Sequence, residues 1–184
     1  MNGFSATDFM SRGLPNGGAR ANLFKVSIPS PSGISGDIAT DLVYRAKATS
    51  VPSSTVEAVE VPYGGRTYRF AGTRTYEDWT CTITLDEDQK EKAFFEDWNN
   101  LINDRVTGQS VNPEDYVKDI EIQMLGKDGS VQRTYTLIDA WPHTVGELTL
   151  DWSETGTILE VETTWAYSHW TVKAGTSTGE SGDN

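Results

Sequence analysis

Six stretches of this chain alternate apolar and polar residues, and this period of two constrains the fold more than any other feature. In WTCTITL (79–85), Trp79, Cys81 and Ile83 alternate with three threonines. Because successive side chains of a β-strand point to opposite faces, each stretch offers one face to a core and one to solvent. The other five stretches are LFKVSIP (23–29), LVYRAKATS (42–50), DIEIQML (119–125), ELTLDW (147–152) and TILEVETTWAYSHW (157–170). Together they predict antiparallel sheets packed on one core.

Turn signals separate the predicted strands. Asp128-Gly129 within GKDGS favours a tight hairpin between strands that end near Leu125 and begin near Val131. SETGT (153–157) predicts a second hairpin between the last two alternating stretches, and YGGR (63–66) predicts a third.

One segment has a helical period instead. In DEDQKEKAFFEDWNNLIND (86–104), Phe94, Trp98, Leu101 and Ile102 recur at the spacing of one helix face, and acidic residues stand at its start, where the helix dipole favours anions. We therefore predict a mainly β fold: an antiparallel β-sandwich or barrel protomer with one flanking α-helix over about 87–103. Strand parity and helix spacing predict that the core contains the aromatic residues Trp79, Phe94, Trp98, Trp152 and Trp165.

The chain divides into an arm, one domain and a tail. Residues 1–20 are rich in Gly, Ser and Asn and show no period, which predicts an N-terminal arm that becomes ordered on a partner. Residues 21–173 form the predicted β domain, and the small polar residues of 174–184 predict a flexible C-terminal tail.

Charge is distributed unevenly along the chain. Residues 1–76 contain eight Lys/Arg and five Asp/Glu, a net of +3, whereas residues 77–184 contain seven and twenty-two, a net of −15. Tight binding of nucleic acid needs basic side chains at the phosphates, so this balance disfavours it. No apolar run approaches the roughly 20 residues that span a bilayer, and the N-terminus lacks a secretory pattern, so we expect no membrane anchor.

The stretch IDAWPHTVGELTLDW (138–152) is the one candidate for catalytic chemistry, because it places His143 near Glu147 and Asp151. A general acid–base pair needs converging side chains, but both carboxylates have the outward parity of solvated strand residues. Two histidines and a single cysteine of inward parity, Cys81, do not supply a zinc pattern, and no calcium or phosphate loop is present. We expect no enzyme, no cofactor and no metal site.

Two alternatives stay open at this point. One is a hydrolase built on His143 with Glu147 or Asp151. The other is a carbohydrate-binding β-sandwich module, since six tryptophans are present and Trp141 and Trp170 are not assigned to the core.

Three segments carry a family resemblance: AKATSVP (46–52), AGTRTYEDWT (71–80) and WPHTVGELTLDW (141–152). With their flanks they resemble, in order over residues 19–170, the tail tube proteins of contractile-tailed, T-even-type bacteriophages, which are related to type VI secretion tube proteins. The resemblance implies a structural virion protein whose hexameric rings stack into the inner tube of the tail and conduct DNA. The tube protein of a phage-derived contractile injection or secretion system is an alternative within the same resemblance.

The resemblance also implies partners and a place. The partners are further copies of the chain, a sheath around the tube, baseplate and tail terminator proteins at its ends, and DNA that passes without tight binding. The place is the virion tail, assembled in the host bacterial cytoplasm.

Region 49–75 matches the long hairpin of the family, which reaches toward a neighbouring ring, and Pro52, Pro62 and Gly64-Gly65 fit such an extended excursion. Stacking head to tail requires that one end of the subunit complements the other, and the uneven charge offers this. We hypothesise contacts between subunits or rings at Arg66, Arg69, Arg74, Tyr63, Glu147 and Asp151, of which the last two could instead line an acidic bore.

Overall fold

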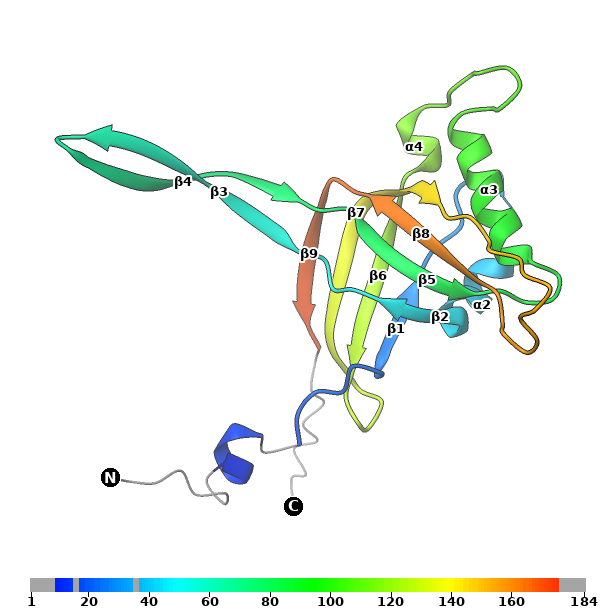
Figure 1. The fold of residues 1–184 in the computed structure, drawn as a ribbon, viewed down its shortest axis with the longest axis horizontal. Coiled ribbons are helices and arrows are strands. Elements are labelled where there is room, and N and C mark those ends of the chain that lie inside the picture. The colour runs from blue at the N-terminus through cyan, green and yellow to red at the C-terminus, as the bar shows by residue number, and fades with distance from the viewer. Residues whose placement is uncertain (1–8, 15–16, 35–36, 176–184) are drawn as a thin grey trace, which may run out of the picture.

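The computed structural model describes residues 9–14, 17–34 and 37–175, and Figure 1 shows their arrangement. The predictions for residues 1–8 of the arm and 176–184 of the tail lie outside the described residues. A seven-stranded antiparallel sheet forms the body of the protein, which confirms the mainly β prediction. Its strands are β1 (Phe24–Ser27), β2 (Ala46–Thr49), β5 (Trp79–Thr84), β6 (Lys118–Leu125), β7 (Val131–Val145), β8 (Glu160–Ala166) and β9 (His169–Ala174).

Strand β7 joins the two halves of this sheet. The order of strands is β1-β6-β7-β8-β5-β2, and β9 pairs with the first half of β7, whose second half pairs with β8. Between the halves, Asp139 has a φ of 55° and its N–H donates to the carboxylate of Asp119 at 3.1 Å. This β-bulge bends the strand, so β5 and β8 run across β6 and β7 in Figure 1.

The core lies where the inward faces of both halves meet the helix α3 (Lys90–Ile102). Trp165 is at its centre, with the rings of Trp98 and Phe95 edge-on to it at centroid distances of 5.3 and 5.9 Å. The three buried indole N–H groups all have acceptors, which are the carbonyl of Ser50 for Trp79, the carbonyl of Tyr116 for Trp98 and the hydroxyl of Thr163 for Trp165. The core is therefore closely packed, and its buried indole N–H groups find hydrogen-bond acceptors within one chain.

Four of the five aromatic side chains predicted for the core are buried: Trp79, Phe94, Trp98 and Trp165. The fifth prediction was wrong, because Trp152 is fully exposed at 103%. The predicted strand 147–152 does not form: β7 ends at Val145 and residues 146–159 are a loop. The connection between β7 and β8 is accordingly longer than the hairpin turn predicted at 153–157.

The helix predicted over 87–103 is present as α3, which begins three residues later. The prediction of a single helix was wrong, because Asp37–Arg45 forms a second helix, α2, and Pro113–Tyr116 forms the short α4. Leu42 and Tyr44 share a strand face but lie about 200° apart on a helix. Leu42 is buried and Tyr44 is 87% exposed, as the helix requires, so only β2 remains of the strand predicted over 42–50. The segment Phe9–Gly13 forms one π-helical turn, η1.

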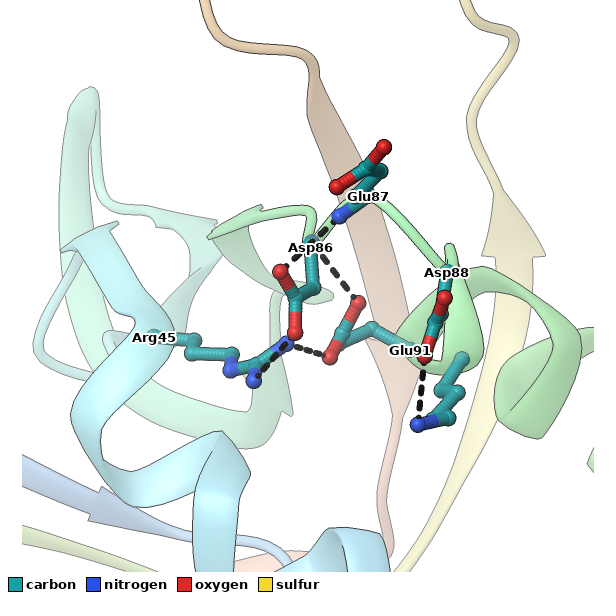
Figure 2. A network of polar contacts seen from close by, with 6 residues as sticks. Arg45, Asp86, Glu87, Asp88 and Glu91 are labelled. Atoms are coloured by element: carbon teal, nitrogen blue, oxygen red, sulfur yellow. Dashed lines mark hydrogen bonds and ion pairs between the residues drawn. The ribbon is translucent and has the colours of Figure 1, made fainter.

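A network of charged groups fixes α2 to the beginning of α3 (Figure 2). The buried carboxylate of Glu91 pairs with the guanidinium of Arg45 and accepts the backbone N–H of Asp86 at 3.1 Å. The Asp86 carboxylate in turn accepts from Arg45 at 3.0 Å. Because Arg45 ends α2 and Glu91 lies in the first turn of α3, this network joins elements that are distant in the sequence.

Candidate assembly interface: the β3–β4 hairpin and the 146–159 loop

The strands β3 (Ser54–Tyr63) and β4 (Arg66–Tyr76) form a two-stranded sheet that shares no strand with the main sheet. Figure 1 shows this hairpin projecting from the body along the long axis of the molecule. Gly64 and Gly65 close it with φ values of 59° and 77°, the left-handed backbone of the turn that matches strand twist. The hairpin accounts for most of the excursion predicted over 49–75.

One face of the hairpin is apolar and exposed. Val59 lies opposite Phe70, and Val61 lies opposite Tyr68, so these four side chains share a face. Between 43% and 59% of each side chain is exposed. Tyr63 and Arg66 face each other at the tip of the same face.

The opposite face of the hairpin is mixed and carries its ion pair. Arg69 lies opposite Glu60, and its Nε donates to the Glu60 carboxylate at 2.8 Å. Nearer the body, a guanidinium nitrogen of Arg74 donates to the Ser54 hydroxyl at 3.3 Å. Of the three arginines predicted as contacts, Arg69 therefore has an ion-pair partner within its own chain.

An apolar face on a two-stranded sheet requires a partner. A lone two-stranded hairpin is at best marginally stable in water, and it stabilises when a third surface covers its apolar side. The nearest candidate, the body of the same chain, does not cover these side chains, since they are exposed. Exposed apolar surface of this kind is typical of surfaces that contact another molecule.

The loop 146–159 lies at the opposite end of the molecule from the hairpin tip (Figure 1). The N–H of Gly146 donates to the carbonyl of Glu162 at 2.8 Å, and a side chain at Gly146 would come within 2.7 Å of that oxygen. The chain then leaves the sheet until the carbonyl of Leu159 accepts from Leu85 at 2.9 Å. Glu147 and Asp151, two of the predicted contact residues, are exposed on this loop.

His143 does not meet the two carboxylates that its sequence neighbourhood suggested. It is the extra residue of a second β-bulge, between Pro142 and Thr144, and it is exposed. Its ring nitrogen Nδ1 lies 3.8 Å from the carboxylate of Asp78, and its ring meets Trp141 edge-on. The carboxylate of Asp151 instead accepts hydrogen bonds from the hydroxyl and the N–H of Ser153. Both bonds lower the pKa of Asp151, and the bond from the hydroxyl has the larger effect. The catalytic group that the hydrolase alternative requires is not assembled.

No metal or reactive thiol site is built by the described residues. They contain no group of three or more His, Cys, Asp or Glu side chains placed to hold a metal ion. Cys81 is buried, and burial raises the pKa of its thiol to about 12, so it is inert at neutral pH. The carbohydrate alternative gains no support either: Trp141 and Trp170 are half-buried, with edge-on neighbours Tyr116 and Tyr135.

A protein-family model described as phage tail tube protein matches residues 19–173. The chain belongs to the phage tail tube protein family. The tail tube protein gp19 of Enterobacteria phage T4 is 31% identical over 168 residues, which cover 89% of this chain and 98% of the relative. The tail tube protein of Serratia phage KSP90 is 33% identical over 78% of this chain and 81% of its own length.

Solved structures share the fold of this tail tube protein. One is a protein of the sheath–tube complex of an extracellular contractile injection system in its extended state, with a TM-score of 0.63, 17% identity and coverage of 94% of this chain and 99% of the other. Another is the tube-terminating cap of the anti-feeding prophage, with a TM-score of 0.63, 16% identity and coverage of 85% and 91%. A solved Hcp protein has a TM-score of 0.39, too low to support the relation to type VI secretion tubes, which stays a prediction.

Membership in a structural family confirms that this tail tube protein is not an enzyme, and it places the protein in the tail of a virion. No helix in the described part of the chain is long and apolar enough to cross a membrane.

The sequence predicted contacts at three arginines and Tyr63 of the hairpin, but the four apolar side chains that form its exposed face were not predicted. The signal was available: Val59-Glu60-Val61 and Tyr68-Arg69-Phe70 both alternate, and both flank the Gly64-Gly65 turn. Pairing these strands across that turn places the four apolar side chains together.

Proposed function

We propose that this tail tube protein closes hexameric rings that stack head to tail into the inner tube of a contractile phage tail. The observation that carries the proposal is the exposed apolar face of the β3–β4 hairpin, formed by Val59, Val61, Tyr68 and Phe70. In the tube, neighbouring copies cover this face. Burial of about 25 cal/mol per Å² of apolar surface then stabilises both the hairpin and the assembly.

The open edges of the main sheet support closure of a ring. The strands β1 and β2 end the strand order, and β9 pairs with β7 alone. Each of these strands presents unpaired backbone N–H and C=O groups along one side. Antiparallel or parallel pairing with the edge of a neighbouring copy extends the sheet around the ring.

The difference in charge between the hairpin and the body supports stacking. The hairpin carries Arg66 and Arg74 and projects from the body, whereas residues 77–184, which include β5 to β9 of the body, carry the acidic excess. A contact between two different surfaces of identical subunits does not close on itself, so it repeats along an axis. In the tube, Tyr63 and Arg66 at the hairpin tip contact the acidic part of a copy in the next ring.

The remaining partners follow from the same role. A solved relative belongs to a sheath–tube complex, and others belong to a tube-terminating cap and a baseplate. We expect a contractile sheath around this tube, with baseplate and terminator proteins at its ends. DNA passes through the lumen without tight binding, because a net charge of −12 offers few cations to phosphates.

Neighbouring residues on opposite faces of β4 give a matched test. Tyr68→Asp places a charge on the apolar face, and Thr67→Asp places the same charge on the opposite face one residue away. Electron microscopy of the full chain should show six-fold rings and tubes for the wild type and for Thr67→Asp, and neither for Tyr68→Asp. Tubes of normal diameter and yield from Tyr68→Asp would contradict the proposal.

A further inference from the structure

The loop 146–159 carries large apolar side chains that this chain does not cover. Leu150, Trp152 and Ile158 are 76%, 103% and 64% exposed. A tryptophan in full contact with water is unfavourable in a monomer, and tryptophan is enriched among the residues that dominate the free energy of binding at interfaces. This loop therefore has the composition of an interface anchor.

The charge of the same loop indicates which kind of surface it can bind. Glu147, Asp151 and Glu154 are acidic, and the loop contains no lysine or arginine. The Asp151 carboxylate accepts the Ser153 N–H at 2.8 Å, and the Glu154 N–H donates to the Asp151 carbonyl at 3.2 Å. This turn holds Trp152 between Asp151 and Ser153, so the partner requires an apolar recess with a basic rim.

This chain carries such a recess elsewhere. A cavity of about 760 Å³ lies between the segment before β1 and the turn that joins β6 to β7. Leu14, Leu23, Met124 and Leu125 supply its apolar lining. Its charged lining consists of Arg20, Lys127 and one carboxylate, Asp128, which accepts the hydroxyl of Ser130 at 2.6 Å.

We propose that Trp152 of one copy inserts into this cavity of a neighbouring copy, with Asp151 or Glu154 facing Arg20. The inference rests on the proposed assembly into a tube. In it, the 146–159 loop of one copy contacts the cavity of a neighbouring copy rather than that copy's hairpin. The loop lines no part of the cavity of its own chain and lies away from the β6–β7 turn (Figure 1). The contact is therefore heterologous and joins successive copies.

Two properties make the pair complementary. The indole of Trp152 loses its contact with water against leucine and methionine side chains, and its ring attracts the guanidinium at the rim through a cation–π interaction. The acidic flanks of the loop pair with a rim of two cations and one carboxylate. Opposite charges across an interface fix register as well as affinity.

Cross-linking between two singly substituted chains tests the contact directly. One chain carries Ser153→Cys on the loop and the other carries Ala19→Cys at the exposed edge of the cavity. The only native cysteine, Cys81, is buried, so it provides no background. Mixed chains are assembled, treated with a short bismaleimide and digested for mass spectrometry.

The inference predicts a peptide that joins position 153 of one chain to position 19 of the other. A third chain, with Thr67→Cys on the hairpin, supplies the competing assignment. If assembled wild-type rings or tubes form but position 153 links only to position 67, or to neither, the inference is overturned while the proposed function stands. A wild-type chain that stays monomeric under all conditions overturns both.

Substitutions give a second readout in the same assembly. Trp152→Ala should raise the concentration needed for assembly by about tenfold or more, whereas Thr155→Ala on the same loop should leave it unchanged. Arg20→Glu and Asp151→Arg should each weaken assembly, and together they should restore part of the loss. Equal assembly by Trp152→Ala and Thr155→Ala would overturn the inference.

Discussion

The aromatic core around Trp165 and the β3–β4 hairpin are built from the same alternating sequence pattern, yet only the core buries its apolar face within the chain. Trp165 is fully buried, whereas Phe70 is 59% exposed. The body has a helix and a second half of its sheet to pack against, and the hairpin has only its own two strands. Alternation thus identifies an apolar face, but the molecule that covers that face can be another copy.

The sharpest contrast comes from truncating one aromatic side chain in each region. Trp165→Ala should lower the free energy of unfolding by about 3–5 kcal/mol, because it leaves a large cavity in the core. Phe70→Ala should change the stability of the unassembled chain by less than about 0.5 kcal/mol but should reduce tube formation. Denaturant unfolding of the unassembled chain measures the first effect, and electron microscopy measures the second. Equal losses of stability would remove the distinction between the two regions.

The charged network of Figure 2 extends this comparison to α2. Glu91→Ala should lower the free energy of unfolding by about 3 kcal/mol, because it removes one of the two carboxylates that pair with the partly buried Arg45 and leaves the Asp86 N–H without its side-chain acceptor. Glu91→Gln keeps a hydrogen-bond acceptor but loses the charge, so its stability should lie between those of the wild type and Glu91→Ala. Thermal unfolding of the three proteins ranks them. Wild-type stability of Glu91→Ala would show that the contacts of Glu91 do not help to hold α2 against α3.

Charge reversal on the hairpin should affect assembly without affecting the body. Changing Arg66, Arg69 and Arg74 together to Glu should stop stacking but allow rings, and core stability should change by less than about 0.5 kcal/mol. Because Arg69 already pairs with Glu60, Arg66→Glu with Arg74→Glu should retain most of the effect. Particle length distributions by electron microscopy separate rings from tubes. Tubes of normal length from the triple variant would contradict the claim that the arginines of the hairpin are needed for stacking.

The smallest expected effect is a pH dependence at Asp86. The backbone N–H of Glu87, and then Arg45, lower the pKa of this carboxyl. Its contribution to stability is therefore complete above the unfolded pKa of about 3.9 and is lost as the pH falls through the lower folded value. Wild type should exceed Asp86→Asn in stability at pH 6, and the difference should vanish at the acid end of a pH series. A difference that persists below the folded pKa would contradict this assignment.

Much of the body could be predicted from local pattern, because its strands alternate against a core within the same chain. WTCTITL and DIEIQML became β5 and β6, and the apolar face of α3 was visible in the spacing of Phe94 and Trp98. The prediction failed where the same pattern of apolar residues fits both a strand and a helix. Residues 42–45 alternate like a strand, but burial of Leu42 at helical spacing from Ile38 made this segment part of α2.

The interface was harder to predict than the fold. ELTLDW alternates like a core strand, but Gly146 makes the last ladder contact and the chain departs, which leaves Leu150 and Trp152 in solvent. Nothing local distinguishes an apolar residue that its own chain covers from one that a neighbour covers. The register of the hairpin and the exposure of Trp152 supply that distinction, and both depend on contacts between distant parts of the chain.

Hydrogen exchange compared between the unassembled chain and the tube tests the central claim most directly. The amides of β3 and β4, residues 54–76, should exchange rapidly in the unassembled chain, because a lone hairpin opens readily. In the tube their exchange should slow by about a hundredfold or more, as covering the apolar face adds roughly 3 kcal/mol to the free energy of opening. The amides of β5 and β8 should be protected to the same degree in both forms. Equal protection of the hairpin before and after assembly would contradict the account.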